Sequence, residues 1–243
     1  MEKLISQSEA VQQILKGLQL TQSLYVSSLL VGPPATGKRT LVYSLFPDTP
    51  RVSGKDPHGV ANALNLENEL IITEFDALED PESFDFQNKR IVAVADTPLN
   101  ARVADEKFAF IYRMPPLKER PEDIQAFSEL FLAQAREIFS VEKEIRLEPS
   151  HLDLSENLRS LRASVYRQVL IQSMEADEIE AALYHLFLQT LEGNNAYREN
   201  LGILERPMLR AGLERYRSQL KLSEILGINR NTLRKKLHEY RID

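Results

Sequence analysis

Seven consecutive residues, GPPATGK, place a glycine, four residues, a second glycine and a lysine between Gly32 and Lys38. Where such a run joins a strand to a helix, the glycines let backbone N–H groups curl around phosphate oxygens, and the lysine bridges the terminal phosphates. The next residue is usually a Ser or Thr that binds magnesium, but here it is Arg39. The pattern predicts a phosphate-binding loop, with a tight turn that binds nothing as the alternative. The candidate nucleotide-binding residues in this loop are Gly32, Pro33, Pro34, Ala35, Thr36, Gly37, Lys38, Arg39 and Thr40.

Two carboxylates follow a later apolar run, in the stretch LIITEFDAL. Nucleotide hydrolysis needs an acidic residue at a strand end to hold magnesium, and usually a second carboxylate to polarise water. Adjacent acids would be expected, yet Phe75 separates Glu74 from Asp76. We take Glu74 and Asp76 as candidate magnesium ligands, and the alternative is that they only cap the end of a strand.

A third candidate lies in LKLSEILGINRNTLRKKLHEY, residues 220–240. Gly227 permits a tight turn between two short helices, and Leu233 and Leu237 are four residues apart and share one helix face. A helix-turn-helix places such a second helix in the major groove, where some side chains read bases and others contact phosphates. A solvated basic hairpin is the alternative. The candidate DNA-binding residues are Asn229, Arg230, Thr232, Arg234, Lys235 and Lys236.

Apolar runs bounded by polar clusters indicate the elements that must position these residues. Strands are predicted at 24–32, 49–54, 69–75, 90–96 and 108–114. They alternate with helices, the first two at 4–18 and 38–46, which predicts a parallel α/β sheet.

From Pro121 onward the pattern is helical. Helices are predicted over 121–140, 155–173 and 177–191, then a linker over 192–202. Four residues of the third helix are expected to be core because of their helical spacing: Leu183, Leu186, Phe187 and Leu191. Pro207 is expected near the first turn of the following helix.

Composition limits the protein class. The 243 residues are 43% hydrophobic, enough for one large or two modest domains. Cysteine is absent, so disulfides, thiolate zinc sites and thiol nucleophiles are excluded. The first residues lack the apolar core of a signal peptide, and no apolar run approaches the ~18 residues of a membrane span. We therefore expect a soluble, cytoplasmic protein without a membrane partner.

Charge is unevenly distributed along the chain. Residues 205–243 carry ten Lys and Arg against five Asp and Glu, whereas the whole chain has a net charge of -6. A basic tail on an acidic body suggests that only the tail meets a polyanion. The helix around 205–217 is also unusually apolar, which predicts a homodimer contact that would let two recognition helices grip one duplex.

The tail resembles a known family. LERPMLRAGLERYRSQLKLSEILGINRNTLRKKLHEY, residues 204–240, is similar to the carboxy-terminal module of the Fis family, whose DNA-contacting positions fall on the six candidates named above. This resemblance implies double-stranded DNA as a partner.

The upstream chain resembles the AAA+ domain of NtrC-type, sigma-54-dependent enhancer-binding proteins. MPPLKERPEDI, residues 114–124, is similar to that family's link between sheet and helical lid, and SENLRSL, residues 155–161, to its sensor-2 motif. The resemblance implies that Arg159 faces a nucleotide, ATP or ADP, with or without magnesium. It also implies an AAA+ P-loop sheet at 1–145, a helical lid at 146–195 and an all-α Fis-type helix-turn-helix at 196–243.

Several departures accompany this resemblance. The family's GAFTGA loop, which touches the sigma factor, has no counterpart between Lys38 and Glu74. The paired Asp-Glu is replaced by Glu74-Phe75, the sensor-1 Asn falls on Asp96, and no arginine finger is recognisable. Contact with sigma-54 is therefore not expected, and whether the chain is an ATPase is left open.

Three functional hypotheses follow. The first is a dimeric, sequence-specific DNA-binding transcriptional regulator whose degenerate AAA+ domain senses nucleotide or serves as a scaffold. The second is an active ATPase that remodels the transcription machinery. The third is a Fis-like DNA-architectural protein that binds loosely and bends DNA.

Overall fold

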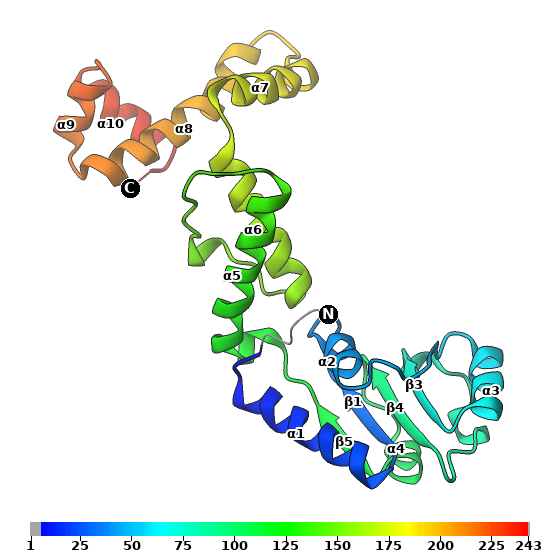
Figure 1. Ribbon diagram of the computed structural model, residues 1–243. Helices are drawn as coiled ribbons and strands as arrows, with labels where there is room; N and C mark the ends of the chain where they lie inside the picture. Colours follow the sequence, from blue (N-terminus) through cyan, green and yellow to red (C-terminus); the bar gives the residue numbers. More distant parts are fainter. Residues whose placement is uncertain (1–5, 243) are drawn as a thin grey trace. The chain divides into compact units, whose positions relative to one another are not determined.

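The computed structural model describes residues 6–242, which form two compact units (Figure 1). The first unit ends at Ser173 and the second begins at Met174. The three-domain division at 145 and 195 stays a prediction. No helix in the described part of the chain is long and apolar enough to cross a membrane.

A five-stranded parallel sheet forms the centre of the first unit, with strand order β2-β3-β4-β1-β5. Its strands are β1 (Ser28–Val31), β2 (Arg51–Ser53), β3 (Glu69–Thr73), β4 (Arg90–Ala95) and β5 (Phe110–Arg113). The inner strands β1 and β4 are buried throughout, because a parallel sheet is covered on both faces. The predicted parallel α/β sheet is confirmed.

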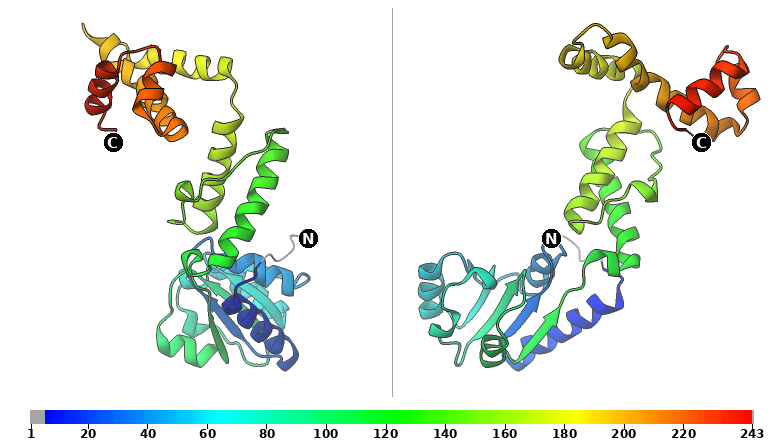
Figure 2. Two further views of the ribbon diagram at one scale, coloured as in Figure 1. Left: turned by 90° about the vertical axis from the view of Figure 1, so that its left-hand side faces the viewer. Right: turned by 180° about the vertical axis from the view of Figure 1, so that it is seen from behind.

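Helices cover both faces of this sheet (Figure 2). Helices α1 (Glu9–Leu24) and α2 (Lys38–Leu45) contribute Leu18 and Leu41 to the core on one face. Helices α3 (Pro57–Leu66) and α4 (Ala101–Lys107) close the other face. Helix α1 ends at Leu24, beyond the predicted end at residue 18. The predicted start at residue 4 lies outside the described residues.

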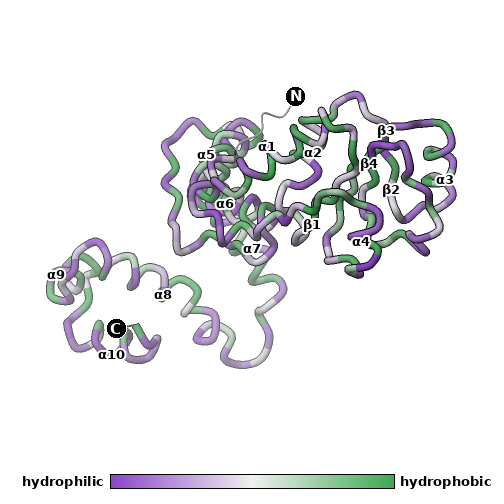
Figure 3. Tube along the Cα trace, turned by 90° about the horizontal axis from the view of Figure 1, so that it is seen from below, coloured by the Kyte–Doolittle hydropathy of each residue, from purple (hydrophilic) through white to green (hydrophobic). Residues whose placement is uncertain are grey.

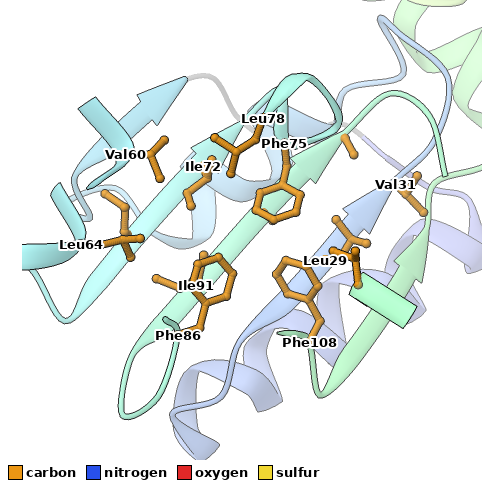
Figure 4. Close-up of a cluster of buried hydrophobic side chains, with 14 residues drawn as sticks. Leu29, Val31, Val60, Leu64, Ile72, Phe75, Leu78, Phe86, Ile91 and Phe108 are labelled. Carbon is orange, nitrogen blue, oxygen red and sulfur yellow. The ribbon is translucent and has the colours of Figure 1, made fainter. Parts of the chain in front are cut away.

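The core on the second face explains the aromatic residue between the two candidate acids. Phe75 is 1% exposed and packs edge to face against Phe86 and Phe108 (Figure 4). An acid at this position would bury an unpaired charge among aromatic rings, which is strongly unfavourable. An apolar residue therefore stands between Glu74 and Asp76 because this position is part of the hydrophobic core.

Two longer helices complete the first unit. Helices α5 (Pro121–Ile138) and α6 (Leu158–Ser173) pack through Phe131, Leu161 and Val165, and Leu117 belongs to the same buried cluster. Their bounds agree closely with the predicted helices at 121–140 and 155–173.

The second unit is all-helical, with α7 (Ala176–Thr190), α8 (Ala196–Tyr216), α9 (Gln219–Ile225) and α10 (Arg230–Glu239). Figure 3 shows α10 as mostly hydrophilic, in contrast to the hydrophobic strand β1. Two sequence expectations are corrected in this unit. The linker 192–202 is wrong because α8 begins at Ala196, and Pro207 lies inside α8, where its missing N–H removes one helical hydrogen bond.

The predicted core of α7 is also wrong. This helix has no buried residue, and Leu186 and Leu191 are 37% and 57% exposed. Helical spacing predicts an apolar face, but it does not tell whether that face is covered within the same chain.

Candidate sites: a phosphate loop and a basic helix

The GPPATGK segment lies between the end of β1 and the start of α2, as predicted. Both of its glycines are needed for the loop shape. A Cβ at Gly32 would lie 2.3 Å from the carbonyl oxygen of Met114, and Gly37 has a φ of 94°. The loop therefore curls over the amino end of α2, where helix N–H groups favour an anion.

Lys38 is held inside this loop. Its Nζ donates hydrogen bonds to the carbonyl oxygens of Gly32 at 2.5 Å and Pro33 at 2.6 Å, and it lies 2.8 Å from a carboxylate oxygen of Asp96. The side chain is only 4% exposed. Burial lowers the pKa of Lys38, although the carboxylate of Asp96 acts in the opposite direction.

A cleft of about 680 Å³ opens beside the loop and reaches Arg159 at the start of α6. This volume falls within the ~300–1,000 Å³ range of small-molecule sites. Arg159 is an exposed side chain and pairs with Glu156 at 3.5 Å. The cleft thus brings the predicted sensor arginine and the predicted loop together within one unit.

Two further arginines, Arg120 and Arg162, also line the cleft. Sequence reasoning missed both of them. Arg120 is 2% exposed, donates to the carbonyl oxygen of Thr36 at 3.0 Å and pairs with Asp123 at 3.1 Å. Its Nε has no hydrogen-bond partner among the described residues. A guanidinium that lines the cleft beside the predicted phosphate loop would suit an anionic ligand. Arg120 belongs to the quoted MPPLKERPEDI segment, so that motif contained a signal for it.

Asn157, which immediately precedes α6, also holds the loop in place. Its amide nitrogen donates to the carbonyl oxygen of Pro34 at 2.9 Å, and its side-chain oxygen accepts from the Leu117 backbone at 2.8 Å. The Leu158 backbone N–H bonds the carbonyl oxygen of Ala35 at 3.0 Å. Asn157 lies within the SENLRSL motif, but only Arg159 was singled out there.

Glu74 is fully engaged by the protein. Its carboxylate accepts from Lys55 at 2.5 Å and from Ser53 at 2.7 Å, and Arg39 lies 3.4 Å away. The hydrogen bond from Lys55, followed by that from Ser53, lowers the pKa of Glu74 to about 2. Its backbone has a φ of 52°, a conformation that costs a non-glycine residue energy. Glu74 therefore already has two cations where a magnesium ligand would need a vacant carboxylate.

Asp76 is engaged separately. It accepts hydrogen bonds from the backbone N–H and the hydroxyl of Thr97 at 3.0 and 2.8 Å. Burial acts to raise the pKa of Asp76, but the hydrogen bonds from Thr97 outweigh it and the pKa is lowered. Among residues 6–242, no group of three or more His, Cys, Asp or Glu could hold a metal ion. Magnesium binding by Glu74 and Asp76 stays a prediction.

The second site is the helical trio at the carboxyl end. Leu209 of α8, Leu222 of α9 and Leu233 and Leu237 of α10 form its buried core. Gly227, at a φ of 64°, makes the turn between α9 and α10 as expected. Part of the apolar surface assigned to a dimer contact is used here, because Gly212 packs directly on Leu222.

Two of the six candidate DNA-binding residues make contacts that stabilise the module. The Asn229 side chain caps α10 by accepting from the Thr232 backbone at 2.9 Å. Lys236 bonds Glu205 of α8 at 2.5 Å, and the hydroxyl of Tyr240 donates to the same carboxylate at 2.7 Å. These contacts tie α10 to α8.

The other four candidates are exposed: Arg230, Thr232, Arg234 and Lys235. Among the described residues, the three cations of this set make no ion pair. Asn231 and His238 are also exposed, and Asn231 shares a face with Lys235 one turn away. Neither is among the six candidates, and because Asn229 caps the helix, Asn231 remains on its outer face.

Comparison with known proteins agrees with this arrangement. Residues 201–240 match the family described as "Bacterial regulatory protein, Fis family". The C-terminal module is a Fis-family helix-turn-helix. Because that match covers only the last helices, it does not by itself assign the rest of the chain.

Similarities extend upstream of the module. The chain is 30% identical over 164 residues to the DNA-binding transcriptional regulator NtrC of Azospirillum brasilense, covering 52% of this chain and 34% of that protein. It is 29% identical over 143 residues to a Geobacillus stearothermophilus protein named limonene hydroxylase, covering 55% and 26% respectively. The chain thus spans about a quarter to a third of the length of these curated relatives.

The fold also has a solved counterpart. A crystal structure of NtrX from Brucella abortus in complex with ATP is similar over 99% of this chain and 69% of its own, with 18% identity and a TM-score of 0.55. The first unit therefore has an AAA+-like parallel α/β core, followed by a helical region that ends in the Fis-family module.

Proposed function

We propose that the chain is a DNA-binding transcriptional regulator whose second unit holds DNA and whose first unit binds ATP or ADP without hydrolysing it. The observation that carries the proposal is α10, a helix of a Fis-family module with three exposed cations that make no ion pair within the described residues. Side chains of this kind suit both phosphate contacts and guanine edges in a major groove.

The nucleotide part of the proposal rests on the first unit. Lys38, Arg120 and Arg162 line one cleft beside a loop that begins a helix, and this combination suits a phosphorylated ligand. When bound, the nucleotide would supply a charged ligand whose presence can stabilise one arrangement of the unit. The NtrX counterpart is named as a complex with ATP, which supports the same ligand class.

Absence of turnover is proposed from the state of the two candidate acids. Glu74 is held by Lys55, Ser53 and Arg39, and Asp76 is held by Thr97. A carboxylate whose oxygens already accept such hydrogen bonds is a weak ligand for magnesium and a weak base towards water. The domain would thus act as a nucleotide sensor, and contact with sigma-54 is not part of the proposal.

Homodimerisation is also proposed, with its contact surface upstream of the predicted 205–217 segment. Exposed apolar side chains gather on α7 and the first half of α8, including Ile179, Tyr184, Leu188 and Tyr197. A second copy of the chain would cover them and bring two α10 helices to one duplex.

Two measurements on the purified full chain test the proposal. Fluorescence anisotropy on labelled duplex DNA should show binding that an Arg234→Ala, Lys235→Ala variant loses by at least about tenfold. The matched control, Arg198→Ala, removes an exposed cation from α8 and should bind as the parent does. Phosphate release in excess ATP should not exceed that of a Lys38→Ala variant.

The outcomes separate the three hypotheses. Turnover that depends on Lys38 would replace the sensor with an active ATPase. Equal affinity for every duplex, together with DNA bending, would favour an architectural protein. No DNA binding by the full chain would remove the regulator assignment altogether.

A further inference from the structure

Three consecutive carbonyl groups of the GPPATGK loop accept hydrogen bonds from residues outside the loop. The donors are the side-chain amide of Asn157, the backbone N–H of Leu158 and the guanidinium of Arg120, which lie 2.9, 3.0 and 3.0 Å from the carbonyl oxygens of Pro34, Ala35 and Thr36, respectively. These three bonds fix the direction of each carbonyl group in the middle of the loop.

Fixing a carbonyl group also fixes the N–H group of the same peptide unit. The peptide bond is planar, and every described one is trans, so the C=O and N–H groups of one unit point in opposite directions. The three units concerned supply the N–H groups of Ala35, Thr36 and Gly37. Within residues 6–242 these N–H groups donate no hydrogen bond, and all three residues line the cleft beside Lys38.

The N–H group of Thr36 is the most telling of the three. Thr36 is only 2% exposed, so water has little access to its backbone. A buried N–H group without an acceptor is rare in folded proteins. Successive backbone N–H groups that lack acceptors form a concave site for an anion. The loop is therefore already arranged for the oxygens of a phosphate chain.

Asn157 is itself held rigidly beside the loop. Its side-chain oxygen accepts from the Leu117 backbone N–H at 2.8 Å, which orients the amide nitrogen towards Pro34. Its backbone has a φ of 55°, a conformation that suits asparagine or glycine better than other residues. Asn157 is not among the residues that line the cleft, so it reaches a ligand there only through the loop.

We infer that Asn157 is a positioning residue, which turns the Pro34–Ala35 peptide so that the N–H groups of the loop meet the phosphates of the ligand. This role rests on the proposed nucleotide function and deepens it, because it concerns the phosphate chain and not the nucleoside. Inorganic pyrophosphate should therefore depend on Asn157 as much as ADP does.

Calorimetric titration of the full chain with ADP and with inorganic pyrophosphate tests the inference. Asn157→Gly tolerates the left-handed backbone and removes the bond to Pro34, so it should bind both ligands about three- to tenfold more weakly than the parent. The matched control is Asn88→Gly, which changes an exposed asparagine of the same unit with a φ of 57°. This control should bind both ligands as the parent does.

Nuclear magnetic resonance gives a second readout that a loss of stability alone would not produce. The backbone amide resonances of Ala35, Thr36 and Gly37 should shift when pyrophosphate is added to the parent. Before any ligand is added, the same three resonances should differ between the parent and Asn157→Gly. They should be identical in the parent and Asn88→Gly.

A double-mutant cycle separates the loop from the neighbouring cation. Arg159 lies two residues from Asn157 and lines the cleft, so a weaker affinity could also arise from a displaced Arg159. The loss caused by Asn157→Gly should persist in an Arg159→Ala background. Its disappearance there would assign the effect to Arg159 and overturn the inference.

The remaining outcomes keep the inference distinct from the proposed function. Asn157→Asp keeps the acceptor for Leu117 and lacks the donor to Pro34, so it replaces Asn157→Gly if that variant unfolds, and its loss should be at least as large. Unchanged pyrophosphate affinity in the folded variant would overturn the inference, whether or not ADP binding weakens, and leave the nucleotide function intact. If neither ADP nor pyrophosphate binds the parent, the proposed nucleotide function fails together with the inference.

Discussion

In the first unit, Lys38 and Lys55 lie 2.8 and 2.5 Å from carboxylates, whereas on α10 Arg230, Arg234 and Lys235 make no ion pair among the described residues. A cation paired inside a protein must exchange one partner for another when a ligand arrives. A solvated cation gives up only water, and the counterions come from the DNA. Under the proposed function, a nucleotide would have to displace a paired carboxylate in the first unit, whereas DNA would meet unpaired cations on α10.

The largest expected effect is a loss of stability in the second unit that leaves the first unit unchanged. Leu233→Ala removes a fully buried side chain from the core that joins α8, α9 and α10, and should cost the second unit about 2–5 kcal/mol of stability. DNA binding should fall with it, while nucleotide binding by the first unit stays. Denaturant unfolding monitored together with DNA titration measures both.

The control for this variant is Leu220→Ala on α9, where the side chain is 53% exposed and a change within about 0.5 kcal/mol is expected. A simultaneous loss of nucleotide binding in Leu233→Ala would show that the two regions depend on one another.

The two regions also differ in how far sequence reasoning reached. The strands, the loop at residues 32–38 and the turn at Gly227 follow local rules, namely apolar runs, glycine conformations and helical spacing, and the structure agrees with each. Asn157 and Arg120 were missed because they act on the loop from more than eighty residues away. Local patterns do not reveal these long-range contacts, although both residues lie in segments that carry the resemblance upstream, MPPLKERPEDI and SENLRSL.

The sequence also does not reveal which charged side chains pair with one another. The sequence does not show that Lys55 and Ser53 contact the carboxylate of Glu74, because this contact arises from the pairing of β2 with β3 in the sheet. The exposed apolar face of α7 shows the converse limit, since spacing predicted the face correctly and its burial wrongly.

A smaller effect distinguishes roles along α10. Arg230 stands at the first position of the helix, where a side chain can reach base edges, and Arg230→Ala should weaken binding to a preferred site by about 1–3 kcal/mol. The loss should be much smaller on random duplex, because non-specific binding depends mainly on phosphate contacts. Competition anisotropy with the two duplexes measures the difference.

Lys235→Ala serves as the comparison for Arg230→Ala. As a phosphate contact it should weaken both duplexes alike and reduce the slope of log K against log salt by about 1. Equal losses on both duplexes in Arg230→Ala would reduce Arg230 to a phosphate contact as well.

The smallest effect concerns Glu205, which joins Lys236 and Tyr240 of the C-terminal module to α8. Burial alone would raise the pKa of Glu205, but hydrogen bonds from Lys236 and Tyr240 outweigh it and lower the pKa below the ordinary 4.5. A depressed carboxyl pKa stabilises the fold above the unfolded value and loses this contribution as pH falls through the folded value. Glu205→Gln should therefore cost about 0.5–1.5 kcal/mol near neutral pH, and the difference from the parent should shrink below about pH 4.5.

Thermal unfolding of the parent and Glu205→Gln across this pH range measures the effect, with the exposed Glu214→Gln as the matched control. Alkaline pH gives an independent check, because the hydroxyl of Tyr240 donates to the same carboxylate. The hydrogen bond to Glu205 raises the pKa of Tyr240 to about 12, so its contribution is complete below the ordinary value of 10.0 and is lost only as pH rises through the folded one. A parent–variant difference that stays constant from pH 7 into the acid range would mean that the charge of the Glu205 carboxylate contributes nothing to stability.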